Sequence, residues 1–393
     1  MKKSLIAVAV AGLFAAPVAM AEVTLSGAIN LGMEMGKSSA GSAPGSSSLT
    51  RTLLNANYSH VDLESVDDIG DGNKVIFHYQ LVAAPQAANG VNDTNRNSFL
   101  GVQGGWGAFK MGSNENVYER FMYTADPLDG ALGPGGNLMI LGTPGGSAFQ
   151  AGQTGTNAAG GAGPVGTPQA DFYRRTDNTI WYESPNFGGI SFEVDYTLSA
   201  YKTNVGGTTV DPTVLSIGGK WAPEGAPFYV DLAYEVHNDM FGANQAPGGA
   251  AGGTSSKDDG IQVGGGFSFG DIGLHARYEQ LKYKTDGSTN GITEYKRDAY
   301  WFGVKWNLPS GYVGGEIGIA NEGKTNVGTV NDTDARMYAI GYFHNLSKQS
   351  QLQFIYGRTD NSDQGTYGQA GAPNFGVAGA DHDVFHVGLK HTF

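Results

Sequence analysis

The chain contains no cysteine among its 393 residues. A disulfide scaffold, a thiolate metal centre and a cysteine nucleophile are therefore excluded. Charged residues make up only 16% of the sequence and the formal net charge is −13, so the basic excess that nucleic acid requires is missing and we expect no nucleic-acid partner. No stretch after the N-terminal segment approaches 18 consecutive apolar residues, which excludes a membrane protein built from helices.

The first 21 residues have the three parts of a secretory signal peptide. Lys2 and Lys3 are positive, residues 5–17 are apolar, and Ala19-Met20-Ala21 matches a small-residue cleavage site. We therefore expect residues 1–21 to be removed on export and residues 22–393 to form the folded domain. Loss of the two lysines would take the net charge from −13 to −15.

The rest of the chain alternates apolar and polar residues with a period of two, as strands with one apolar face do. In residues 228–236, Phe228, Val230, Leu232, Tyr234 and Val236 share one parity, and Tyr229, Asp231, Ala233 and Glu235 occupy the other. The same alternation predicts sixteen strands, at 22–35, 57–65, 73–83, 96–103, 107–113, 176–184, 190–200, 213–222, 227–238, 259–269, 272–284, 296–306, 312–323, 334–345, 351–361 and 382–393.

The connections between these strands alternate strictly between long loops and short turns. An even number of antiparallel strands, with tight turns at one end and long loops at the other, is typical of a transmembrane β-barrel. A sheet in lipid must close, because an open edge would leave backbone groups without hydrogen bonds. A soluble sandwich or propeller, the alternative all-β architecture, would have short turns at both ends.

Large aromatic residues lie beside or near the short turns, where an interfacial girdle of a membrane barrel is expected. They are Trp106, Phe187, Trp221, Phe228, Trp306, Tyr312, Phe343 and Phe393. This clustering favours a barrel in a membrane over a sheet around a soluble core.

Two segments resemble the general trimeric porins of Gram-negative outer membranes. Residues 177–189, with the sequence DNTIWYESPNFGG, are similar to a strand and turn of that family, and residues 387–393, VGLKHTF, are similar to its C-terminus. The resemblance covers essentially all of residues 22–393. It implies an outer-membrane, 16-stranded antiparallel barrel that forms a water-filled channel for passive diffusion of ions and small hydrophilic solutes.

The resemblance also implies partners and a constriction. The family forms homotrimers in which the second loop, here 84–95, reaches a neighbour, and it contacts outer-membrane lipid and lipopolysaccharide. Phe393 resembles the terminal signal that the barrel-assembly machinery reads. The third loop, here 114–175, folds inward and narrows the pore. Its 130–168 part departs from the family pattern by expanding into Gly, Ala, Thr and Pro.

Anion-preferring porins carry an arginine ladder on the wall that faces the third loop, and its positions fall on His60, Ser113 and Arg175 in this chain. Only Arg175 is a permanent cation, with Arg174 adjacent. The opposing carboxylates are expected at Asp126 and Asp129, with Glu115 and Glu119 as alternatives. Two missing arginines and the acidic net charge predict a weak cation preference.

Charges of both signs fall on the polar parity of the predicted strands and should therefore face the lumen, where they would sort ions by sign. The strongest candidates are Glu193, Asp195, Asp231, Glu235, Arg277 and Lys305. Their near balance predicts that most of the excess acid lies on turns and outer loops.

Other outer-membrane barrels remain as alternatives, namely a substrate-specific channel, an adhesin or a barrel enzyme. The densest cluster that could serve catalysis or metal binding is Asp381-His382-Asp383. No nucleophile stands at a matching spacing. We therefore expect no enzyme activity, no metal site and no cofactor.

Overall fold

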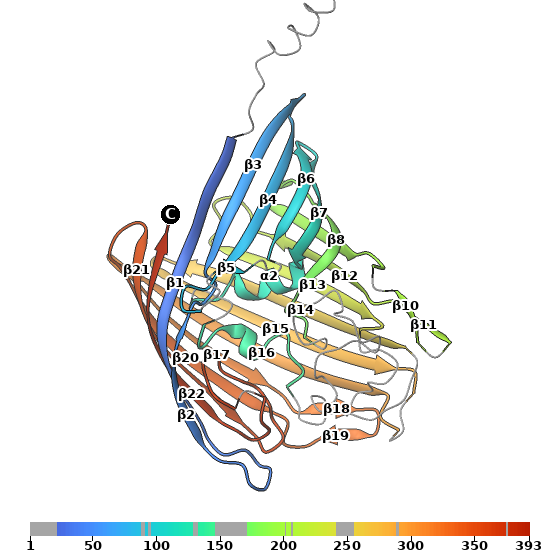
Figure 1. Ribbon diagram of the computed structural model, residues 1–393, viewed down its shortest axis with the longest axis vertical. Coiled ribbons are helices and arrows are strands. Elements are labelled where there is room, and N and C mark those ends of the chain that lie inside the picture. Colours follow the sequence, from blue (N-terminus) through green and yellow to red (C-terminus); the bar gives the residue numbers. More distant parts are fainter. Residues whose placement is uncertain are drawn as a thin grey trace, which may run out of the picture.

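The computed structural model describes residues 22–87, 91–92, 96–128, 133–145, 171–200, 202–205, 207–240, 255–287, 291–374 and 376–393. Within these ranges the chain forms a closed antiparallel barrel, because β1 pairs with β22 on one side and with β2 and β3 on the other (Figure 1). In the described part of the chain, no helix has the length and apolarity needed to cross a membrane.

Sixteen strands make the barrel wall, with β2 and β3 counting as one interrupted strand. They are β1 (Glu22–Ser38), β2 (Leu49–Asn55) with β3 (His60–Gly70), β4 (Asn73–Ala83), β6 (Ser98–Gly104), β7 (Gly107–Glu115), β8 (Arg175–Glu183), β9 (Ile190–Thr197), β12 (Thr213–Trp221), β13 (Phe228–Asn238), β14 (Ser256–Phe269), β15 (Ile272–Thr285), β16 (Glu294–Leu308), β17 (Gly311–Ala320), β20 (Ala335–Asn345), β21 (Ser350–Asn361) and β22 (His382–Thr392). The predicted 16-stranded antiparallel barrel is confirmed.

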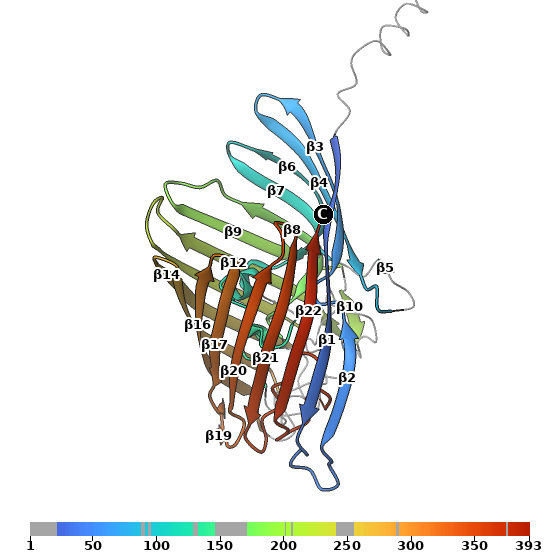
Figure 2. The ribbon, with the colours of Figure 1, turned by 90° about the vertical axis from the view of Figure 1, so that its left-hand side faces the viewer.

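Short elements extend the long loops. They are β5 (Val91–Asn92), the hairpin of β10 (Thr203–Val205) with β11 (Thr208–Val210), and the hairpin of β18 (Gly323–Thr325) with β19 (Gly328–Val330). The short turns and the C-terminus lie at one end of the barrel, and the long loops lie at the other (Figure 2). The strand predicted at 57–65 is in fact longer: it begins at Leu49 and is interrupted near Tyr58, whose φ is 52°.

The alternation of side chains matches a membrane barrel. Along β20, buried and exposed residues alternate strictly from Ala335 to Tyr342. Large apolar side chains on the outer face of the barrel are exposed. Leu232, Phe302 and Ile340, for example, are 51%, 52% and 57% exposed. An apolar outer face of this kind is suited to lipid rather than water.

The predicted aromatic girdle is only partly on the outer surface. Trp106, Phe187, Trp221, Trp306 and Phe393 are exposed. Phe343, by contrast, is fully buried and stacks on Tyr312 with ring centroids 4.4 Å apart. The prediction was wrong for this pair, because both residues lie on the inward parity of their strands.

Candidate functional site

The third loop leaves β7 and runs inside the barrel before it enters β8. Its described part contains α2 (Val117–Tyr123) and the short helix η1 (Asn137–Met139). α2 packs against β9, β12 and β13, well inside the ring of strands (Figure 1). The inward direction implied by the family resemblance is therefore what the structure shows for residues 114–128 and 133–145.

Polar groups on the wall hold the start of this loop. The Val117 backbone N–H donates to the Asp195 carboxylate at 3.1 Å, and the Asn116 amide donates to Glu235 at 3.2 Å. Arg120 of α2 forms an ion pair with Glu193 of β9. The hydrogen-bonding needs of these buried carboxylates are thus met by donors of the loop, as is usual for buried polar groups.

A second attachment holds the far part of the loop. The fully buried Glu279 accepts hydrogen bonds from the Gly142 N–H at 2.9 Å, the Tyr118 hydroxyl at 3.1 Å and Arg297 Nη1 at 2.8 Å. Arg297 Nη2 in turn donates to the Ile140 carbonyl at 3.0 Å and to the Thr143 carbonyl. One buried ion pair on the wall thus bonds two separate parts of the described loop, at Tyr118 and at residues 140–143.

The wall also makes room for the loop. A Cβ atom at Gly314 would lie 2.4 Å from the Pro127 carbonyl oxygen, closer than real Cβ atoms approach. Glycine at this inward position lets the loop backbone lie directly on β17.

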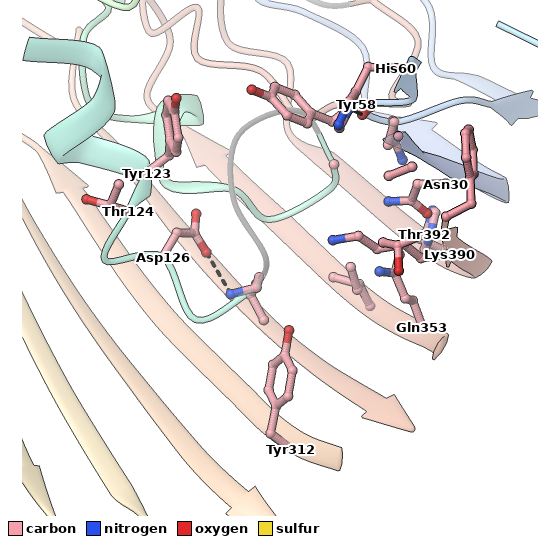
Figure 3. Close-up of a pocket in the computed structure, with 18 of the residues that line it drawn as sticks. Asn30, Tyr58, His60, Tyr123, Thr124, Asp126, Tyr312, Gln353, Lys390 and Thr392 are labelled. Carbon is pink, nitrogen blue, oxygen red and sulfur yellow. Dashed lines mark hydrogen bonds between the residues drawn. The ribbon is translucent and has the colours of Figure 1, made fainter. Parts of the chain in front are cut away.

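A cavity of about 640 Å³ remains between the edge of the loop and the opposite wall (Figure 3). Tyr123, Thr124, Asp126, Leu128 and Gly133 line it from the loop side. The wall side is formed by the break before β3 and by strands β1, β3, β16, β17, β21 and β22. The residues that line it from this side include Asn30, Tyr58, His60, Asp62, Lys305, Tyr312, Gln353, His386, Lys390 and Thr392.

Charges of opposite sign line the cavity. The Asp126 carboxylate accepts the N–H groups of Leu128 at 2.7 Å and Asn137 at 2.8 Å, which fixes it at the loop edge. Lys390 lies across the cavity from Asp126 (Figure 3), and Lys305 also lines the wall. His60 lies 3.3 Å from Asp62 on the same wall. A water-accessible cavity of this volume, lined by charges of both signs, suits hydrated ions and small polar solutes.

The sequence profile of the Gram-negative porin family matches residues 7–364. The chain belongs to the Gram-negative porin family. It is 29% identical to outer membrane porin protein 32 of Delftia acidovorans over 399 residues, which covers 100% of both chains. An outer membrane porin protein of Bordetella pertussis is 24% identical over 384 residues, covering 86% of this chain and 83% of the relative.

Solved outer-membrane proteins share the fold. The anion-selective porin from Comamonas acidovorans matches with a TM-score of 0.70 at 23% identity, covering 95% of this chain and 100% of that one. A trimer form of OmpT from Vibrio cholerae matches with a TM-score of 0.58 at 14% identity, covering 95% and 99%. The chain is thus an outer-membrane porin, a channel for passive diffusion of small solutes, as predicted.

Within this porin, the expected constriction residues have different surroundings. His60 and Asp126 line the cavity. Arg175 forms an ion pair with Glu115, which also lies 3.4 Å from the Tyr58 hydroxyl and is 1% exposed. Ser113 is buried in β7 and does not line the cavity. Asp129 lies outside the described residues.

Arg174 does not face the cavity, contrary to the expectation for a wall charge. Its side chain is 0% exposed, Nε donates to the Asp171 carbonyl at 2.7 Å, and Nε lies 3.9 Å from Glu235. The chain turns Arg174 beneath the loop just before β8 begins, so this arginine compensates buried acid instead of meeting solute.

Carboxyl groups under the loop have raised pKa values. Burial, together with the nearby Glu235 carboxylate, raises the pKa of Glu119 to about 8. Burial also raises the pKa of Asp171 to about 7. Glu119 is therefore mostly neutral at pH 7 and is a poor candidate for a fixed negative charge opposite the wall.

Five of the six expected lumen charges hold the structure together and do not line the cavity. Glu193, Asp195 and Glu235 bind the third loop. Arg277 pairs with Asp231 through bonds of 2.6 and 3.1 Å. Only Lys305 of this set lines the cavity.

Several cavity residues were missed as constriction candidates. They are Tyr58, Asp62, Tyr123, Gln353 and His386. Strand parity already places Gln353 and His386 inward, but parity alone does not say how far along the barrel axis the loop crosses. At the seam, Phe393 and Gly27 exchange two backbone hydrogen bonds of 3.1 Å, so the terminal residue pairs with the first strand. Among the described residues, no group of three His, Asp or Glu side chains could hold a metal ion.

Proposed function

We propose that the 640 Å³ cavity is the narrowest part of the diffusion path and that residues 123–128 of the third loop set its size. The observation that carries this proposal is the attachment of the loop by the buried Glu279–Arg297 pair, which keeps one loop edge opposite the wall of β1, β21 and β22. Solute selection then depends on the side chains at the two faces of this opening.

We propose that the channel discriminates only weakly between anions and cations at neutral pH. Two acidic side chains, Asp62 and Asp126, and two lysines, Lys305 and Lys390, line the cavity, so their charges balance. This revises the expected cation preference, which counted the net charge of the chain, because most of the excess acid does not line the cavity.

The remaining parts of the proposal come from the family. We propose that the protein forms homotrimers, that residues 1–21 are removed on export, that the barrel-assembly machinery reads Phe393, and that lipid and lipopolysaccharide cover the outer face. The trimer form of OmpT supports the first of these. We further propose that the protein acts only as a channel and has no enzyme activity, since its relatives are named as porins.

Conductance in planar bilayers tests the position of the opening. Thr124→Trp places a large ring at the loop edge and should lower the single-channel conductance in KCl. Thr329→Trp, in the exposed β18–β19 hairpin, is the matched control and should leave it unchanged. Equal conductance in all three proteins would show that solutes pass elsewhere.

A further inference from the structure

A second, smaller cavity of about 200 Å³ lies at the short-turn end of the barrel. It adjoins the cavity described above, because Lys305, Tyr312, Lys390 and Thr392 line both. Its remaining residues come from the end of β20, the turn to β21 and the start of β21, and they include Lys348. The smaller cavity therefore lies directly beside the larger one, toward the short turns.

The charged side chains that line this second cavity are all lysines, namely Lys305, Lys348 and Lys390. Among its lining residues there is no aspartate or glutamate, and the other polar groups are amides and hydroxyls. The larger cavity differs, since Asp62 and Asp126 balance its lysines. The positive charge is therefore concentrated at the short-turn mouth.

The wall holds one of these lysines in place. The Lys305 ammonium lies 3.9 Å from the centroid of the Tyr312 ring. Tyr312 stacks on the fully buried Phe343, which fixes the ring. An ammonium group seated on an aromatic face is attracted by the ring but keeps N–H donors for another partner.

Neutral donors lie between the lysines. Gln351 pairs with Lys390 across β21 and β22, and its amide donates to Asn345 at 2.9 Å. Gln353 donates to Gln351 at 3.3 Å, so the amides form a row along the wall. Phe393 lines the larger cavity and its backbone hydrogen bonds to that of Gly27. Three ammonium groups and a row of amides suit a ligand that carries several negative charges.

We propose that this lysine-lined cavity binds small polyanions, namely solutes with two or three carboxylate or phosphate groups, as they enter from the short-turn side. The proposal rests on the proposed function, because the cavity adjoins the opening through which solutes pass. A monovalent anion gains little there, since one charge in water interacts weakly with each lysine at physiological salt.

One-sided block of single channels tests this site. Citrate added on the short-turn side should lower the KCl conductance in a concentration-dependent way, whereas citrate on the long-loop side or acetate on either side should not. Lys348→Gln should raise the half-blocking citrate concentration about fivefold, the factor for one unit-charge contact across about 4 Å in water. The triple variant Lys305→Gln/Lys348→Gln/Lys390→Gln should abolish the block.

Lys202→Gln is the matched control, because Lys202 is an exposed lysine in the long loop before β10 and should leave the block unchanged. If the triple variant does not assemble, Lys348→Gln and Lys348→Glu decide the question, since Lys348 lies in an exposed turn. Equal block from both sides, or block that survives removal of the lysines, overturns the inference. A wild-type protein without conductance steps would instead contradict the proposed function.

Discussion

Removal of the Glu279 carboxylate should release the third loop from the wall. In Glu279→Ala, Arg297 loses its ion-pair partner at 2.8 Å, and the Gly142 N–H and Tyr118 hydroxyl lose their acceptor. All of these contacts are buried, so water cannot replace the lost hydrogen bonds while the loop stays packed against the wall. We expect the barrel to assemble, because the strand pairing of β15 with β14 and β16 stays intact.

The size of the effect follows from the burial of the pair. Glu279 and Arg297 are both 0% exposed, and loss of one member of a buried pair costs about 3–5 kcal/mol because the other charge is left uncompensated. The lower bound corresponds to a change of roughly 150-fold in the ratio of attached to released loop. The double variant Glu279→Ala/Arg297→Met leaves no buried charge unpaired and should be less severe than Glu279→Ala alone.

Single-channel recording in KCl provides the assay. Glu279→Ala should show a higher mean conductance and larger current fluctuations than the wild type, and the double variant should lie between them. Heat-modifiable migration in gels checks that each barrel is assembled. If assembled Glu279→Ala channels had wild-type conductance and noise, the attachment of the loop by this pair would not set the opening.

Three further predictions use the same recordings. Arg175→Ala leaves Glu115 without its ion-pair partner and should shift the reversal potential in a KCl gradient toward cations, and a shift toward anions would contradict the pairing. Burial raises the pKa of Glu119 from 4.5 to about 8, so attachment of the loop is favoured at low pH and weakens as the pH rises through this interval. The current noise of the wild type should therefore grow between about pH 5 and pH 9. The noise of Glu119→Gln should not change over this range. Deletion of residues 133–168 removes the contacts of Ile140, Gly142 and Thr143 with Glu279 and Arg297 and should raise the conductance, whereas an unchanged value would show that this segment does not narrow the path.

The strands were predictable because burial on one face imposes a period of two. The strand expected at 227–238 is observed as β13 (Phe228–Asn238), where large apolar residues recur at every second position. β2 (Leu49–Asn55) was missed because Leu53 and Leu54 are adjacent and break the alternation, and because the chain bends at Tyr58 before it continues as β3.

The site was less predictable, because it depends on which wall residues lie level with the loop. His60 and Asp126 were expected on opposing faces of the constriction only through the family resemblance, and both line the cavity. Arg174 and Arg175 are neighbours in sequence but occupy different surroundings, one beneath the loop and one against Glu115. Local sequence does not encode this difference, which arises from packing between the loop and distant strands.

Cysteine modification tests most directly that solutes pass between residues 123–128 and the opposite wall. The chain has no cysteine, so Asp126→Cys, Gln353→Cys and the lipid-facing control Phe302→Cys each carry a single reactive thiol. A bulky water-soluble thiol reagent should lower the single-channel conductance of the first two variants, whose positions line the cavity from opposite sides, and leave the third unchanged. Modification of Asp126→Cys and Gln353→Cys, verified by mass, without any loss of conductance would contradict the account.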